Sequence, residues 1–145
     1  MDRRMGMTLD AADPRALGAL WALALGYVED APPDGFADWP SALVAWGVPR
    51  EVWDDFYALV DPDGAGLRFF LQRVPEGKTA KNRLHLDIRV PGARDATTRP
   101  GPQEVRASTG RLVSAGARVV REHDDPSMGF WIVLQDPEGN EFCAV

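Results

Sequence analysis

The feature that most constrains the fold is a short turn sequence that occurs twice. Asp61-Pro62-Asp63-Gly64 recurs 75 residues later, about half the chain length, as Asp136-Pro137-Glu138-Gly139. Each copy closely follows an apolar and aromatic run, at 56–60 and at 130–134. A strand–turn–strand unit repeated at this spacing predicts a chain built from two copies of one smaller module. A cleft between two such copies is the natural place for a binding site.

The composition is that of a globular protein, and it excludes several classes of function. Of the 145 residues, 45% are hydrophobic and 26% are charged, which is enough apolar sequence for a real core. The formal net charge of −6 disfavours phosphate backbones, so we expect no nucleic-acid partner. We also expect no membrane partner, because no segment approaches the ~18 apolar residues of a span. With one cysteine, Cys143, and no recognisable secretion signal, we expect a cytoplasmic protein without an internal disulfide.

Turn residues and hydrophobic periodicity predict the same element order in both halves, which we divide into module one (1–79) and module two (80–145). In module one, Asp13 and Pro14 begin a helix that Gly26 ends. The other segments expected there are a strand at 5–10, a loop at 27–35, a short helix at 38–47, and strands at 52–60 and 67–74. In module two we expect a strand at 83–90, a loop at 91–102, a helix at 103–115, and strands at 119–120, 130–134 and 140–145.

The strand at 83–90 has the clearest alternation in the chain. Leu84, Leu86, Ile88 and Val90 alternate with polar or charged residues. This pattern predicts that the apolar side chains pack under a helix. The opposite face would carry Arg83, His85, Asp87 and Arg89.

Several motifs, taken in order, resemble those of one known family. They are Ala12-Asp13-Pro14, Leu25-Gly26-Tyr27, the two Asp-Pro-x-Gly turns, Gln72-Arg73-Val74-Pro75-Glu76, Lys81-Asn82-Arg83-Leu84-His85-Leu86-Asp87 and Asn140-Glu141-Phe142-Cys143. Their order and spacing resemble the glyoxalase-like branch of the vicinal oxygen chelate superfamily, which includes glyoxalase I, extradiol dioxygenases and bleomycin-resistance proteins. The resemblance implies an α+β fold, with paired βαβββ modules forming one domain: an open eight-stranded cup with helices outside. It also implies a small-molecule ligand in the cup, often held through a divalent metal such as Zn, Fe, Ni or Mn.

The resemblance also assigns candidate metal ligands. His85 stands where the second module supplies an imidazole, so it would bind a metal or act as a general base. Asp10 lies 75 residues earlier, in the first strand of module one, and would be another ligand. The last-strand ligand position of module two falls on Cys143 instead of a glutamate, and that of module one on Gln72 or Arg68. Because a metal site normally needs about three protein ligands, this incomplete set favours a protein without a metal.

Two tryptophans are candidate ligand contacts. Trp39 and Trp46, together with Trp53, lie in a stretch peculiar to the first half. They would form an apolar lid that stacks on a planar ligand. Alternatively, they fill a local core or line a dimer interface.

Polar residues and the cysteine complete the set of candidate contacts. Arg83 belongs to a basic cluster that would receive an anionic ligand group or form surface ion pairs. Asp87 shares the polar face of His85 and would face the ligand with it. Gln72 and Cys143, at the last-strand positions, would contact the ligand from the neighbouring strands. The alternative for Cys143 is a small buried side chain, and we prefer it to a nucleophilic role.

These observations leave two functions open. One is a glyoxalase-like enzyme, such as a lyase, isomerase or dioxygenase acting on a small organic molecule through His85. The other is a non-catalytic protein that sequesters a small molecule, as bleomycin-resistance proteins do. The incomplete ligand set favours the second, or an enzyme without a metal. The resemblance also implies a homodimer.

Overall fold

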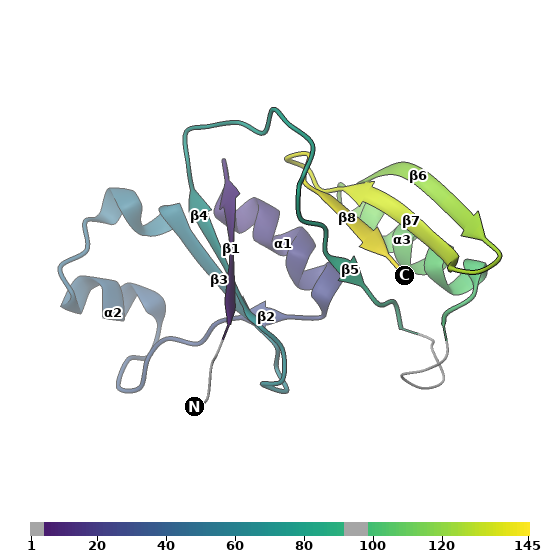
Figure 1. Ribbon diagram of the computed structural model, residues 1–145. Coiled ribbons are helices and arrows are strands. Elements are labelled where there is room, and N and C mark those ends of the chain that lie inside the picture. Colours follow the sequence, from purple (N-terminus) through teal and green to yellow (C-terminus); the bar gives the residue numbers. More distant parts are fainter. Residues whose placement is uncertain (1–4, 92–98) are drawn as a thin grey trace. The chain divides into compact units, whose positions relative to one another are not determined.

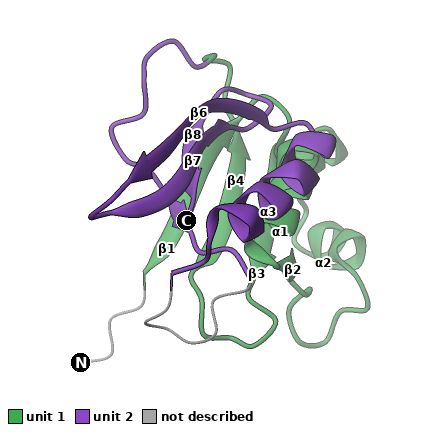
Figure 2. Ribbon diagram, turned by 90° about the vertical axis from the view of Figure 1, so that its right-hand side faces the viewer, with its two compact units in different colours: residues 1–77 green, residues 78–145 purple. Residues whose placement is uncertain are grey.

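A computed structural model describes residues 5–91 and 99–145 (Figure 1). The chain divides into two compact units, Met1–Gly77 (unit one) and Lys78–Val145 (unit two), coloured separately in Figure 2. The boundary lies two residues before the one that we expected between residues 79 and 80. Each unit has its own sheet and its own helix packed on that sheet, so each is described by itself.

Unit one is a four-stranded mixed sheet with the strand order β1-β4-β3-β2. Its elements are β1 (Gly6–Ala11), α1 (Pro14–Leu25), β2 (Val28–Glu29), α2 (Trp39–Ala45), the 3-10 helix η1 (Arg50–Asp55), β3 (Phe56–Val60) and β4 (Arg68–Arg73). β1 pairs with β4 in parallel, whereas the β4–β3 and β3–β2 pairs are antiparallel. α2 and η1 are inserted between β2 and β3, so this unit is a βαβββ module with a helical insertion.

Local sequence explains α1 and the face of the sheet that it covers. The Asp13 carboxylate accepts a hydrogen bond at 3.0 Å from the N–H of Ala16, and Gly26 ends the helix with a φ of 70°. Trp21 of α1 packs on Phe69 of β4, with 5.1 Å between ring centroids. Side chains alternate along a strand, so the opposite face of β4 carries Arg68, Phe70 and Gln72.

Unit two repeats this architecture. Its elements are β5 (Asp87–Ile88), α3 (Pro102–Ser114), β6 (Arg118–Asp125), β7 (Gly129–Gln135) and β8 (Glu141–Ala144), in the strand order β5-β8-β7-β6. β5 pairs with β8 in parallel, as β1 does with β4, and the other pairs are antiparallel. Val105, Thr109 and Leu112 form the buried face of α3, as the helical periodicity predicted. The α+β class and the repeated βαβββ module are therefore confirmed.

The repeated turns have the same conformation in both units. Asp61 accepts hydrogen bonds from the N–H groups of Asp63 at its side chain and of Gly64 at its carbonyl, both at 3.0 Å. Asp136 makes the corresponding bonds with Glu138 and Gly139, again at 3.0 Å. Each turn ends on a glycine with positive φ, which residues with a side chain rarely adopt.

The expected strand at 83–90 is wrong over its first half. Only Asp87–Ile88 form ladder pairs, although backbone hydrogen bonds to β8 and the chain end extend the pairing from Leu86 to Val90. Leu84 does not pack under a helix, because it is 70% exposed. Alternation alone could not define the strand, because β8 begins only at Glu141 and provides no partner for 83–85.

Three other boundaries differ from the expected ones. The expected loop at 27–35 contains the short strand β2, and the first residues of the expected strand at 52–60 belong to η1. The strand expected at 119–120 extends from Arg118 to Asp125. Most of the expected loop at 91–102 lies outside the described residues. Over the described ranges, no helix is both long enough and apolar enough to cross a membrane.

Candidate functional site

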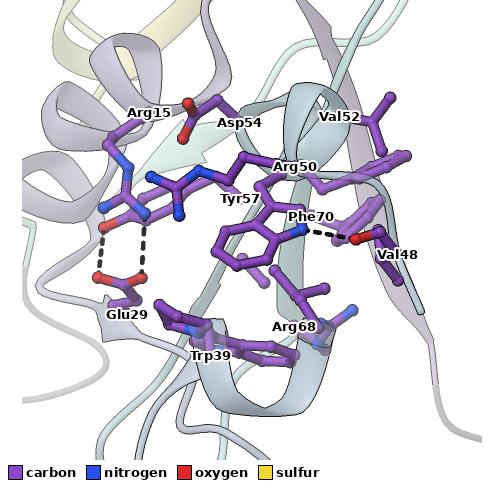
Figure 3. A pocket seen from close by; sticks show the side chains of 15 residues that line it. Arg15, Glu29, Trp39, Val48, Arg50, Val52, Asp54, Tyr57, Arg68 and Phe70 are labelled. Atoms are coloured by element: carbon purple, nitrogen blue, oxygen red, sulfur yellow. Dashed lines mark hydrogen bonds and ion pairs between the residues drawn. The ribbon is translucent and has the colours of Figure 1, made fainter. Parts of the chain in front are cut away.

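Unit one contains a pocket of about 240 Å³ at the uncovered edge of its sheet (Figure 3). β2 pairs only with Leu59 and Val60, so the earlier residues of β3 have no ladder partner on that side. The inserted α2–η1 segment fills part of this edge and forms the pocket wall. Trp39 and Leu43 come from α2, and Trp53 comes from η1.

The two tryptophans of the wall are fixed by their own N–H groups. The indole N–H of Trp39 donates to the backbone oxygen of Asp30 at 2.7 Å. That of Trp53 donates to the backbone oxygen of Val48 at 2.9 Å. Both indole donors are therefore used within the protein, and the rings offer only apolar surface to a ligand.

The sheet contributes an aromatic pair from the face opposite α1. Phe56 on β3 and Phe70 on β4 stack with their centroids 5.8 Å apart and their planes 21° apart. Phe70 is half-buried and Phe56 is exposed. Together with Trp39 and Trp53, they give the pocket flat apolar surfaces that suit a planar molecule.

Three arginines line the pocket, but only two of them have acidic partners. Arg15 pairs with Glu29 at 3.5 Å, and Arg68 pairs with Asp30 at 2.7 Å. Arg50 instead lies over the ring of Trp53, with its guanidinium carbon 4.3 Å from the centroid. No hydrogen bond or ion pair joins the Arg50 side chain to another residue in the described part of the chain.

Tyr57 closes the Arg15 side of the pocket. Its hydroxyl donates to Glu29 at 3.4 Å, and the Arg15 guanidinium lies 4.7 Å from its ring centroid. Burial, and then the Glu29 charge, raise the pKa of Tyr57. The phenol therefore stays protonated near neutral pH.

Unit two contains a separate pocket of about 410 Å³ on the sheet face opposite α3. Its lining includes Asp87, Arg99, Trp131 and Cys143. Next to it, the His123 ring stacks on Trp131 with 4.6 Å between centroids and 8° between planes. Both pockets are open, and each lies within one unit.

Cys143 is a protonated thiol in this second pocket. Burial, and then the charge and hydrogen bond of Asp87, raise the pKa of Cys143 to about 11. Asp87 and Cys143 are direct neighbours in the β5–β8 ladder. A thiol in this environment is a poor nucleophile near neutral pH.

His85 lies just before β5 and lines neither pocket. Its Nε2 atom is 2.8 Å from the Nζ atom of Lys81. In module one, the Asp10 carboxylate accepts a hydrogen bond at 2.8 Å from the side-chain amide of Gln72, its ladder partner on β4. The two candidate metal ligands are therefore both engaged, and they belong to different units.

The strand ladders also change the correspondence between the two first strands. When the two β-turns are aligned and the ladders are followed outward, Asp87 corresponds to Thr8 and Arg89 corresponds to Asp10. Asp10 and His85 are therefore not equivalent positions, although 75 residues separate them. The difference arises because the connection from β3 to β4 is longer than that from β7 to β8.

These donors do not fit a resident metal ion. Within 5–91 and 99–145, no three His, Cys, Asp or Glu side chains come together as a ligand set. The Lys81 ammonium lies where a cation would approach Nε2 of His85. The Cys143 thiol stays protonated, whereas a metal ligand must be deprotonated.

The remaining candidate contacts are dispersed. Trp46 is 53% exposed and does not line the pocket, but it packs edge-on against Trp39 with 6.4 Å between centroids. Arg83 is exposed, and neighbours in its basic cluster form the ion pairs Arg73–Asp55 at 2.7 Å and Lys78–Glu141 at 3.2 Å.

Sequence reasoning missed Arg50, Phe56 and Phe70 as pocket residues. A signal existed for Arg50, because a 3-10 helix has three residues per turn and places it over Trp53. That signal was lost when 52–60 was interpreted as a strand. Phe56 and Phe70 meet only through the β3–β4 register, which the sequence does not state.

Comparisons with known proteins agree on one family. The family model described as "Glyoxalase-like domain" matches residues 6–145. None of the curated proteins matches the chain. Among solved structures, the hypothetical protein SA1046 from S. aureus has a TM-score of 0.59 at 16% identity, covering 99% of this chain and 96% of that one.

Two further structures carry functional descriptions. A glyoxalase/bleomycin resistance protein/dioxygenase family enzyme from Burkholderia phytofirmans PsJN has a TM-score of 0.62 at 14% identity, covering 95% of this chain and 93% of that one. A mutant of the fosfomycin resistance protein FosX from Listeria monocytogenes, complexed with Mn(II) and 1S,2S-dihydroxypropylphosphonic acid, has a TM-score of 0.63 at 14% identity. It covers 99% of this chain and 91% of its own length is matched. At these identities the likeness shows the fold.

Proposed function

The chain belongs to the glyoxalase-like domain family of the vicinal oxygen chelate superfamily, and from this premise we propose that it binds a small planar organic molecule in the pocket of unit one. The observation that carries the proposal is the pair of anchored indoles, Trp39 and Trp53, facing the stacked pair Phe56 and Phe70. Rings whose polar atoms are already bonded are preorganised for stacking, so little ordering free energy is lost on binding.

We propose sequestration without chemical change. The described lining of the pocket holds no His, Cys, Ser, Thr or Lys side chain. Its phenol, Tyr57, has a raised pKa and already donates to Glu29. A bleomycin-resistance-like binding role therefore has more support than a lyase, isomerase or dioxygenase acting through His85.

Tryptophan fluorescence tests the proposal directly. A panel of planar and non-planar organic compounds is titrated into the protein, and quenching is compared for Trp53→Phe and Trp131→Phe. Planar compounds should quench the wild type and the Trp131→Phe variant, whereas Trp53→Phe loses most of the response. Quenching that survives in Trp53→Phe but is lost in Trp131→Phe would move the site to unit two, and no response to any compound would reject the proposal.

The fate of the ligand separates sequestration from catalysis. The best quencher is incubated with stoichiometric protein, and the small molecule is recovered and weighed by mass spectrometry. Recovery of unaltered ligand agrees with sequestration, whereas a product that accumulates with time indicates an enzyme. The homodimer implied by the family resemblance remains a prediction, which sedimentation velocity tests on the same sample.

A further inference from the structure

We propose that the pocket of unit one selects planar aromatic carboxylic acids, and that Arg50 binds the carboxylate. This inference rests on the proposed function and names its ligand class. It starts from a difference among the three arginines that line the pocket. Arg15 and Arg68 each have a carboxylate partner, whereas Arg50 contacts only an aromatic ring within the described residues.

The contact with Trp53 orients Arg50 without neutralising it. A guanidinium 4.3 Å from an indole centroid is attracted to the ring face, and its N–H donors remain available at the edges. Arg50 lies in η1, three residues before Trp53, so the pairing follows from the turn of the 3-10 helix. A carboxylate beside the indole would therefore meet a prepositioned fork of donors.

The rest of the pocket requires a flat ring on the same ligand. The N–H groups of Trp39 and Trp53 are bonded to the backbone, so the walls cannot recognise a polar ligand by hydrogen bonding. Phe56 and Phe70 add only apolar surface (Figure 3). The pocket thus combines stacking surfaces with one unpaired cation.

The charges of the lining also favour an anion. Three guanidinium groups line the pocket, opposed by the carboxylates of Glu29 and Asp54. Glu29 is already paired with Arg15 and bonded to Tyr57. Asp54 is the competing feature, because its carboxylate would repel an acid and attract an amine.

Matched pairs of acid and amide test the inference by calorimetry. The probes are benzoate with benzamide, 2-naphthoate with 2-naphthamide, and indole-3-acetate with indole-3-acetamide. Each pair keeps its ring and loses only the charge. In at least one pair, the acid should bind wild-type protein about tenfold more tightly than the amide, as expected for a charged hydrogen-bonded pair.

Three variants assign the preference to a residue. Arg50→Gln should reduce the affinity for the acid to that for the amide, with amide binding changed by less than about twofold. Arg111→Gln, which removes the same charge from an exposed position on α3, should keep the full preference. Asp54→Asn should strengthen acid binding by about twofold because it removes the competing carboxylate.

The outcomes separate this inference from the function on which it rests. Equal binding of acid and amide by the wild type, or an acid preference that survives Arg50→Gln, overturns the ligand class but leaves a small-molecule pocket. Tighter binding of 2-naphthylmethylamine than of 2-naphthoate also overturns it and assigns the recognition to Asp54. Failure of every probe to bind overturns both proposals.

Discussion

Glu141 on β8 accepts a hydrogen bond at 3.0 Å from the backbone N–H of Asn82, 59 residues earlier in the chain. Lys78 adds an ion pair at 3.2 Å, and the Glu141 side chain is only 11% exposed. These contacts fix the start of unit two to its last strand. They explain why residues 83–85 stay close to the sheet without joining it.

Glu141→Gln should lower the free energy of unfolding by about 1–3 kcal/mol, because it removes a charged acceptor from two buried bonds. Urea denaturation measures the change. Glu76→Gln, at an exposed position in unit one, is the matched control and should change stability by less than about 0.5 kcal/mol. Equal stability of the two variants would show that the Glu141 contacts contribute nothing.

The same carboxylate predicts a dependence of stability on pH. Burial acts to raise the pKa of Glu141, but the hydrogen bonds from Asn82 and Lys78 outweigh it and lower the pKa from 4.5 to about 2. Because the folded pKa lies below the unfolded one, this contribution is complete above about pH 4.5 and is lost as the pH falls toward 2. The stability difference between wild type and Glu141→Gln should therefore shrink across this window. A difference that stays constant down to pH 2 contradicts the assignment.

Gly18 of α1 is required by its contact with Tyr57. A Cβ atom at this position would lie 2.6 Å from Cε1 of the Tyr57 ring. Gly18→Ala should therefore destabilise the protein by about 1–3 kcal/mol through overpacking, although alanine favours helices. Gly110→Ala in α3 is the control, because nothing lies within 4 Å of its Cβ, and it should stabilise by about 0.5–1 kcal/mol. Thermal melts of both variants measure the effect, and a stabilised Gly18→Ala would contradict the packing argument.

Much of the architecture could be predicted because its signals are local. The repeated turns gave the duplication, and Asp13, Pro14 and Gly26 gave the bounds of α1. The segment at 83–90 failed because a strand needs a partner, and alternation does not say where the partner begins. Arg50–Asp55 failed because Val52 and Trp53 are typical strand residues but here follow a proline into a 3-10 turn.

The pocket could be predicted only in part. Trp39 was identified from its position in the segment peculiar to the first half, and it lines the pocket. Arg50 and Phe70 were not, because their roles depend on a helix type and on strand register. The correspondence between Asp10 and His85 failed for a related reason: equal spacing in sequence does not survive connections of unequal length.

His85→Ala and chelator treatment should both leave ligand binding unchanged. The His85 imidazole faces the Lys81 ammonium and lines neither pocket, so neither change touches the site proposed in unit one. Binding of the best fluorescence quencher, measured before and after EDTA and in the variant, should differ by less than about twofold. Metal analysis of the purified protein accompanies it. A bound divalent metal that is lost in His85→Ala together with ligand binding would restore the metal-assisted enzyme.

Cys143 should react slowly with alkylating reagents despite lining an open pocket. With its pKa raised from 9.0 to about 11, the thiolate fraction near neutral pH is about a hundredfold lower than for an ordinary cysteine. Iodoacetamide labelling followed by mass spectrometry should therefore require a correspondingly longer time than labelling of the urea-unfolded chain. Asp87→Asn should accelerate the reaction, because the Asp87 carboxylate is the second cause of the raised pKa, after burial. Labelling as fast as in the unfolded chain, or a rate unaffected by Asp87→Asn, would mean that the thiol and carboxylate are not coupled across the β5–β8 ladder.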